Sequence, residues 1–529
     1  MNLLTRTQHL GTAAILLGVS IFLSRFMGLI RAKVISYYYG AGMEADIFFA
    51  AFVIPDFINY LLAGGYFSIT LIPLLTRRFA ESEDSGWQLF STIFWWVCVA
   101  STACVALAWI FAPRFALMTT PGFVKTPEAM DKLVLFLRII LPGQMFFLPG
   151  ACLSALLYMR KQFAAPAIMP LIYNGAIILG GVAMLYIMPE RGMEGFCWGV
   201  LVGAFIGAFL LPLLVVRANG FRLSFSLRDK DFVTFTLLAL PLMLGQSIVV
   251  LEEQFIRIFG SLASEGSVSL LVYARRVALV PAGIVAQAAG VATYPFLASL
   301  AVAGDTKRFD ETLATAARHS LALAIPICTW MGAAAMPIMR LLFEQGKFTA
   351  ESTYTSALLL VIMLPAMVCW VIHQLVSRAF YAREDTLTPA VIGTLVTILF
   401  LPVYWGLVRI IDSYGIAAAG SLAVIAYTVG LTWIWTRRHG DGAIAGILPF
   451  LTLGLAICVL PSAIAFAVAI KLPVILPVHP LIGAALALAC SGLAFGIIYI
   501  ACAWRFAPQF LVPVRIVTDA CIARIRRKR

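Results

Sequence analysis

Two arginines lie inside the first long apolar segment of the chain, where a cationic side chain is energetically costly. Arg25 and Arg31 are six residues apart in a run of mostly apolar residues. Insertion scales put the cost of one such cation at roughly 3 kcal/mol, so it normally faces a protein interior or a water-filled cavity. On a helix the two side chains are about 120° apart and can both border one wide cavity. The pattern predicts a polar cavity that receives an anion.

A second pair of arginines stands in a later apolar segment. Arg275 and Arg276 occur in LVYARRVALVP, and with Arg25 and Arg31 they would offer guanidinium donors to a phosphate or pyrophosphate, which arginine binds in a bidentate way. The alternative for Arg31, Arg275 and Arg276 is snorkelling to the membrane interface. Asp46 begins the second apolar segment. It either caps that helix or faces the mouth of the cavity.

Two acidic residues lie in the seventh apolar segment, close to a cation. Glu253 and Arg257 are four residues apart and can neutralise each other on one helix face. Alternatively, Glu252 or Glu253 couples transport to a cation or a proton, since carboxylates within membrane segments are usually functional.

The composition places these residues in an all-α polytopic membrane protein. The chain has 529 residues, of which 62% are hydrophobic and only 12% charged, about half the charge of a soluble protein. Apolar runs long enough to cross a bilayer recur along its length. We expect about fourteen spans, at about 8–37, 47–75, 87–112, 132–158, 164–188, 194–216, 232–259, 267–302, 314–339, 353–381, 387–411, 414–436, 443–470 and 478–504.

The chain has a net charge of +13, and its Lys and Arg residues are concentrated in alternate connections between the spans. This distribution indicates a membrane topology rather than nucleic-acid binding. The even-numbered connections hold about fifteen Lys and Arg residues and the others about eight, so we expect both termini in the cytoplasm. The basic tail in 509–529 is then an anchor at an anionic leaflet.

An internal repeat relates spans one to six to spans seven to twelve. YMRKQFAAPA (158–167) and YAREDTLTPA (381–390) share Tyr, Arg, Pro and Ala at the same offsets, and proline pairs in spans two and eight also correspond. Parallel repeats of this kind build transporters with a cavity between two halves. We therefore expect an N-lobe at 1–220, a C-lobe at 221–440, and two further helices at 441–508.

The sequence does not predict an enzyme. The five histidines are isolated, the cysteines form no C-x-x-C pair, and no Walker A sequence occurs. We expect no metal site and no cofactor, so that transport is driven by the membrane potential or by an ion or substrate gradient.

The chain resembles the MurJ/MviN family of lipid II flippases, within the multidrug/oligosaccharidyl-lipid/polysaccharide exporter superfamily. The resemblance is carried in order by SRxxGxxR (24–31), GAGxxxD (40–46), AFxxP (51–55), TPGF (120–123), EGSVSLLVYARR (265–276), GKFTA (346–350) and FYARED (380–385).

The resemblance implies a two-lobe, fourteen-helix flippase of the bacterial inner membrane. It would move lipid II, the undecaprenyl-pyrophosphate-linked peptidoglycan precursor, to the periplasmic leaflet for cell-wall biogenesis. It assigns pyrophosphate binding to Arg25, Arg31 and Arg276, matches Asp46 to an acidic residue before the second helix, and gives helices thirteen and fourteen a groove for the lipid tail. A monomer suffices, because both halves lie in one chain.

Several positions depart from the family pattern. Ala32 and Gly64 replace acidic residues, Asn59 and Tyr60 stand where many members have an arginine pair, and Arg275 replaces an aspartate. Export of another polyprenyl-linked oligosaccharide is therefore the alternative function. A membrane scaffold that binds anionic lipid without transport is a further alternative, whereas cavity arginines disfavour a cationic drug as substrate.

Overall fold

The computed structural model describes residues 7–63, 70–218, 220, 222, 229, 231–237, 254–281, 283, 285, 287–440, 442, 444, 446–476, 478–513 and 515. These residues form helices joined by turns, with no strand among them, as expected for an all-α protein. The chain divides into two compact units, Met1–Ser269 and Leu270–Arg529. The lobes expected at 1–220 and 221–440 remain a prediction.

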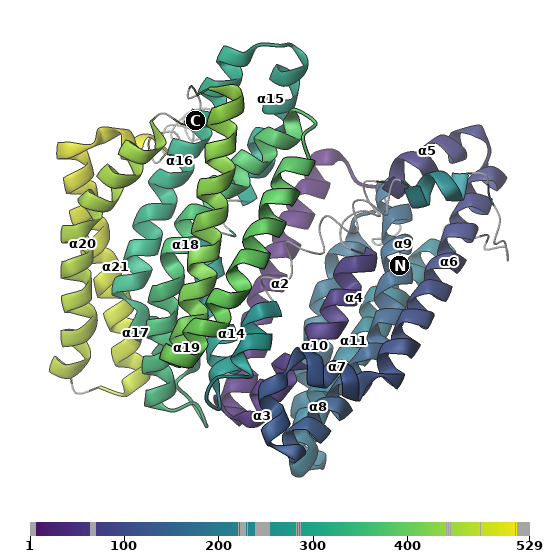
Figure 1. Cartoon of the computed structure of the whole chain (residues 1–529), viewed down its shortest axis with the longest axis horizontal. Coiled ribbons are helices and arrows are strands. Elements are labelled where there is room, and N and C mark those ends of the chain that lie inside the picture. The colour runs from purple at the N-terminus through teal and green to yellow at the C-terminus, as the bar shows by residue number, and fades with distance from the viewer. Residues whose placement is uncertain are drawn as a thin grey trace, which may run out of the picture. The chain divides into compact units, whose positions relative to one another are not determined.

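The first unit begins with a 30-residue helix and continues through shorter helices (Figure 1). Its main pairs are α2 with α10, α10 with α11, α5 with α6, and α6 with α9. The elements are α2 (Leu10–Tyr39), α3 (Met43–Ala50), α4 (Val53–Ala63), α5 (Ile72–Glu81), α6 (Glu83–Ile110), α7 (Ala112–Thr119), η2 (Pro121–Lys125), α8 (Pro127–Ile140), η3 (Leu141–Gly143), α9 (Gln144–Met159), α10 (Ala164–Ile187), η4 (Pro189–Arg191), α11 (Gly192–Gly203), the π-helix η5 (Ala204–Leu210) and α12 (Leu211–Ala218).

The second unit consists mainly of long helices. Its first element, α14 (Ser267–Pro281), starts within the last residues of the first unit. α18 packs on α16 and α19, and α20 packs on α16 and α21. The remaining elements are α15 (Gln287–Val302), α16 (Thr306–Ala333), α17 (Ala335–Phe343), α18 (Ala350–Ala382), α19 (Leu387–His439), α20 (Ile447–Ile475), α21 (Pro480–Phe506) and η7 (Pro508–Leu511).

Many of these helices are suited to cross a membrane. Within the described residues, eight are long and apolar enough, or nine if the bent pair α16–α17 counts as one span. α19 has 53 residues, which at 1.5 Å per residue is about 80 Å and far exceeds a hydrocarbon core of roughly 30 Å. Ile411 and Asp412 have non-helical backbone angles inside it. They divide α19 at the place where the sequence predicts two spans, 387–411 and 414–436.

Two other predicted spans are not straight helices. The segment expected as one span at 47–75 contains α3, α4 and the start of α5. Pro55 lies in the first turn of α4, where its missing N–H costs no helical hydrogen bond. The span expected at 314–339 bends by 74° between α16 and α17.

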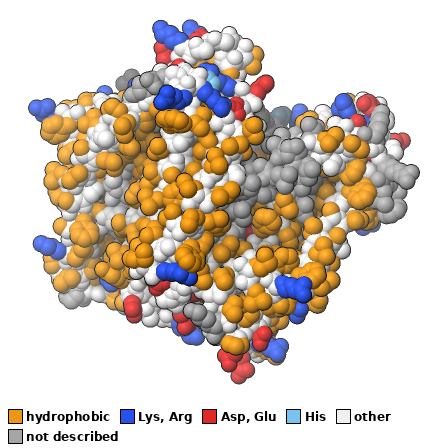
Figure 2. Space-filling model, viewed as in Figure 1, with side chains coloured by type: hydrophobic (Ala, Val, Ile, Leu, Met, Phe, Trp, Pro, Cys, Tyr) orange, Lys and Arg blue, Asp and Glu red, His pale blue; other side chains and the backbone are white. Residues whose placement is uncertain are grey.

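Apolar side chains cover much of the surface of the long helices. Figure 2 shows hydrophobic groups over the visible middle of the second unit, with Lys and Arg side chains mainly toward the helix ends. Between α18 and α19, Ser421 Oγ donates to the Ile362 carbonyl at 2.8 Å and Thr428 Oγ1 to the Cys369 carbonyl at 3.3 Å. Hydroxyls that bond across helices are a common feature of membrane packing. The protein is a multi-pass membrane protein.

The turns after α9 and α18 have the same geometry, at the two segments that the expected repeat aligns, 158–167 and 381–390. Lys161 and Glu384 both have positive φ, at 60° and 61°. Lys161 N donates to the Tyr158 carbonyl and Glu384 N to the Tyr381 carbonyl, each at 3.0 Å. The next amide in each turn reaches back five residues, as in the common left-handed ending of a helix.

Candidate functional site

The arginines of the first apolar segment lie on α2, but in different environments. Arg25 is exposed on the first unit, whereas Arg31 is half-buried. The Nε atom of Arg31 is buried and has no hydrogen-bond partner among the described residues. Of the two, Arg31 is therefore the cation in the interior of this unit.

Three titratable side chains from other elements lie near Arg31. Tyr173 comes from α10, Asp56 from α4, and Arg257 from a helix at 254–260. α10 also packs directly against α2. The described residues around Arg31 thus include a second guanidinium group and one carboxylate.

Asp56 and Arg257 form an ion pair in this interior. Arg257 Nη1 donates to Asp56 Oδ2 at 2.6 Å and to Gln254 Oε1 at 2.8 Å. The Arg257 side chain is only 12% exposed, and Gln254 is fully buried. Sequence reasoning missed Asp56, although a lone aspartate directly after Pro55 in an apolar run was a signal of its importance.

The acidic residues predicted beside Arg257 cannot be placed. Glu252 and Glu253 lie outside the described residues. The pairing of Glu253 with Arg257 and the ion-coupling role of either glutamate therefore remain predictions.

Asp46 is buried and caps a helix far away in sequence. It is 1% exposed, and its carboxylate accepts N–H groups of Gly266 at 2.8 Å and Ser269 at 2.7 Å. These amides lie at the start of α14, where a negative charge is favourable. Of the two roles expected for Asp46, capping its own helix is wrong, because its side chain stabilises α14 instead of α3. A place at the mouth of the cavity remains a prediction.

The segment before α14 makes the reverse contact. Glu265 Oε1 accepts the N–H of Met43, the first residue of α3, at 3.0 Å. Each helix start is thus capped by an acidic side chain of the other segment. Gly266 has φ +87° at this junction, and a Cβ there would lie 2.3 Å from the Ala41 carbonyl oxygen. The close approach requires glycine.

Arg275 and Arg276 lie on α14 and are both half-buried. They belong to the second unit, whereas Arg25 and Arg31 belong to the first. A single phosphate site built from both pairs therefore remains a prediction.

The comparison with known families identifies the chain. A family model described as lipid II flippase MurJ matches residues 35–499. The chain belongs to the MurJ family. Similar members include probable lipid II flippases of Rickettsia prowazekii, 24% identical over 85% of this chain and 89% of the relative, and of Rhizobium meliloti, 27% identical over 82% of each.

Solved structures show the same fold. A structure of lipid II flippase MurJ in an inward closed conformation aligns with a TM-score of 0.77 at 21% identity, over 94% of this chain and all of that one. An inward-facing MATE family transporter aligns with a TM-score of 0.67 at 13% identity, over 81% of this chain and 98% of that one. The fold is therefore shared by MurJ and MATE proteins.

Three of the residues that depart from the expected MurJ pattern lie on two helices of the first unit. Ala32 is fully buried on α2, and Asn59 and Tyr60 are half-buried on α4. Asn59 and Tyr60 are three and four residues after Asp56, and therefore on the same face of α4. Arg257 thus brings a cation to the helix on which the resemblance led us to expect an arginine pair. Gly64 lies outside the described residues.

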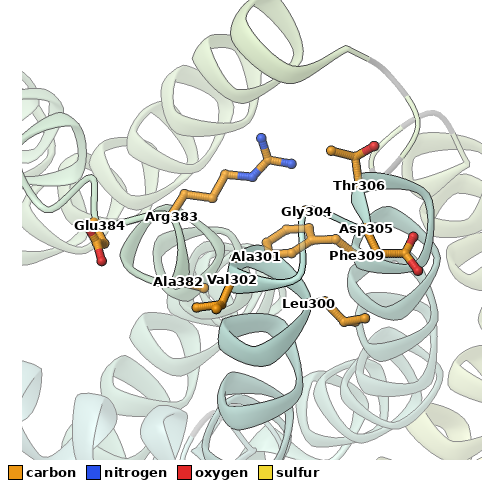
Figure 3. Close-up of a pocket in the computed structure, with 10 residues that line it drawn as sticks. All are labelled: Leu300, Ala301, Val302, Gly304, Asp305, Thr306, Phe309, Ala382, Arg383 and Glu384. Atoms are coloured by element: carbon orange, nitrogen blue, oxygen red, sulfur yellow. The ribbon is translucent and has the colours of Figure 1, made fainter.

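A second polar feature lies entirely within the second unit. A cavity of about 300 Å³ opens between the end of α15, the start of α16 and the end of α18. Arg383 extends across it over the ring of Phe309, while Glu384 points away (Figure 3). The guanidinium carbon is 4.8 Å from the Phe309 ring centre and 5.2 Å from that of Trp435. This arrangement orders the turn between α18 and α19.

The described residues contain no group of three or more His, Cys, Asp or Glu side chains placed to hold a metal ion.

Proposed function

We propose that this chain is a flippase that moves lipid II from the cytoplasmic to the periplasmic leaflet. The proposal rests on its membership of the MurJ family together with one observation, the half-buried Arg31 beside Asp56 and Arg257 inside the first unit. A guanidinium in a low-dielectric interior is a strong ligand for phosphate.

In this proposal, fourteen helices form two six-helix lobes that open alternately to each side of the membrane. Arg25, Arg31 and Arg276 hold the pyrophosphate while the glycan crosses the cavity. α20 and α21 supply a groove for the prenyl tail. The fold shared with MATE transporters supports a transport cycle of this kind.

The same proposal covers the oligomeric state, the location and the energy source of the protein. The chain works as a monomer in the bacterial inner membrane, with both termini in the cytoplasm and the basic tail against the anionic leaflet. It is a transporter without ATP hydrolysis, driven by the membrane potential or an ion gradient.

Complementation tests the function directly. The lipid II flippase of a bacterial host is depleted while this chain is expressed as wild type, Arg25→Ala or Arg114→Gln. We expect rescue by the wild type and by Arg114→Gln, since Arg114 is an exposed arginine on α7, and failure of Arg25→Ala at equal expression. Rescue by Arg25→Ala would contradict the pyrophosphate role of Arg25.

The second candidate is a flippase for another polyprenyl-linked oligosaccharide. Ala32, Asn59, Gly64 and Arg275 favour it, because they change the charge of the expected cavity. A well-expressed, membrane-inserted wild type that fails to rescue growth would favour this candidate. Restoring the family residues Asn59→Arg and Tyr60→Arg should then shift activity toward lipid II.

A further inference from the structure

The interior of the first unit contains a group of charged side chains to which the comparisons with known proteins give no role. Arg31 and Arg257 lie near one carboxylate, that of Asp56. Arg257 Nη1 donates to Asp56 Oδ2 at 2.6 Å, and the same nitrogen also donates to Gln254 Oε1 at 2.8 Å. The three charged groups come from three separate chain segments, so the fold assembles them.

Among the described residues near Arg31, two guanidinium groups share one carboxylate. An excess of positive charge is costly in a low-dielectric interior. A pyrophosphate diester carries two negative charges and would match both guanidinium groups if Asp56 were not paired with one of them. Asp56 therefore occupies the position that a second anionic oxygen would take.

The solvent exposure of these side chains would allow Arg257 to exchange Asp56 for another anion. The Asp56 side chain is 28% exposed and that of Arg257 12%, while Gln254 is 1% exposed. An anion can approach the Asp56 side of the pair while Gln254 keeps the guanidinium in place. A preorganised guanidinium loses little freedom when it binds its ligand.

Building on the proposed function, we propose that Asp56 is an internal counter-ion that holds Arg257 until the substrate pyrophosphate displaces it. Arg31 and Arg257 then form a two-arginine anion site. Asp56 lowers the affinity of this site and, by returning to Arg257, speeds release of the anion. It thus determines how readily the protein exchanges one substrate for the next.

Binding measurements test this exchange. The full chain is placed in phosphatidylcholine nanodiscs, with undecaprenyl pyrophosphate as the probe and uncharged undecaprenol as its control. We expect Asp56→Asn to bind the probe about tenfold tighter and Arg257→Gln about tenfold weaker, each tenfold change being about 1.4 kcal/mol. Arg114→Gln is the matched control on an exposed surface and should bind as the wild type does.

The two substitutions should change the affinity for the probe in opposite directions. This distinguishes the counter-ion role of Asp56 from a purely structural one. If the pair only stabilised the fold, both substitutions would weaken binding, and Asp56→Asn binding no tighter than wild type would overturn the proposal. The double variant Asp56→Asn/Arg257→Gln gives an independent check. It should bind the probe more weakly than Asp56→Asn, because the gain in that variant depends on the Arg257 guanidinium; a double variant that binds as tightly as Asp56→Asn would also overturn the proposal.

The proposal and the proposed function can fail separately. If the wild type rescues growth but Asp56→Asn binds the probe no more tightly, lipid II transport is supported and the counter-ion role is rejected. No rescue, combined with tighter binding by Asp56→Asn, would support the exchange site and assign it to a different pyrophosphate-linked lipid.

Discussion

Arg160 and Arg383 occupy equivalent positions in the two halves of the chain and make equivalent contacts. Arg160 follows α9 and lies over the rings of Phe79 and Trp87, at 5.5 and 5.1 Å. Arg383 follows α18 and lies over Phe309 and Trp435, at 4.8 and 5.2 Å. In each half one of the rings stands near the start of a long helix, α6 or α16.

The contact of Arg383 should contribute measurably to stability. A cation over an aromatic ring contributes about 0.5–1 kcal/mol when exposed and about 2 kcal/mol when desolvated. We expect a coupling of about 1 kcal/mol between Arg383→Gln and Phe309→Leu in a double-mutant cycle of unfolding in detergent. Arg437→Gln is the control, because Arg437 and its ring partner Trp433 are both exposed. Strict additivity of the two substitutions would show that the contact does not stabilise the fold.

The Asp46 cap should stabilise the protein more than a surface ion pair formed by the same helix does. Loss of a helix cap costs about 1–2 kcal/mol, whereas exposed ion pairs contribute about 0–1 kcal/mol. Asp46→Ala should therefore lower the melting temperature clearly more than Glu44→Gln, which removes only the exposed 2.6 Å pair with Lys132. Similar melting temperatures for the two variants would argue against the capping role.

Gly266 should tolerate no side chain. Alanine there would combine the strain of φ +87° with a backbone clash at 2.3 Å, so we expect Gly266→Ala to destabilise the protein by at least about 2 kcal/mol. Gly304→Ala is the matched control: its φ is +70°, but a Cβ there meets nothing within 4 Å. It should cost only about 1 kcal/mol. Thermal unfolding of both variants in one detergent measures the difference; equal losses would attribute the effect to φ alone.

Asp385, in the connection between α18 and α19, should make stability depend on pH on the acid side. Partial burial acts to raise its pKa, but hydrogen bonds from Thr388 and the charge of Arg438 outweigh this and hold the pKa below its usual value. Because the folded-state pKa is the lower one, the stabilisation is complete above the unfolded pKa of about 3.9 and is lost as the pH falls through the folded value. Melting temperatures between pH 6 and pH 3 should therefore fall less steeply for Asp385→Asn. An identical slope in both proteins would contradict this.

Helix positions could largely be predicted from the sequence, because a membrane helix satisfies its own backbone and needs only a long apolar run. The ends of α10 and α18 fall within a few residues of the predicted spans. The division of the second span into α3 and α4 was missed, since hydropathy does not report where a helix breaks.

The candidate site was harder to predict, because its contacts join distant segments. Pairing with Glu253 was one expectation for Arg257 and stays a prediction, because Glu253 lies outside the described residues. The bond of Arg257 to Asp56 of α4 was not foreseen. Likewise, capping its own helix was one of the two roles expected for Asp46, and its carboxylate instead contacts the start of α14. Helical periodicity describes neighbours within one helix and carries no information about partners brought together by the fold.

The reciprocal caps of α3 and α14 also constrain how the protein is made. Residues 43–46 leave the ribosome long before residues 265–269, so the Asp46 carboxylate enters the membrane environment before its partner amides exist. Until then it must stay hydrated at the bilayer surface or be shielded by the insertion machinery. The first half of the chain can therefore reach its final form only after synthesis has passed residue 269, and truncated products that end earlier lack both reciprocal caps.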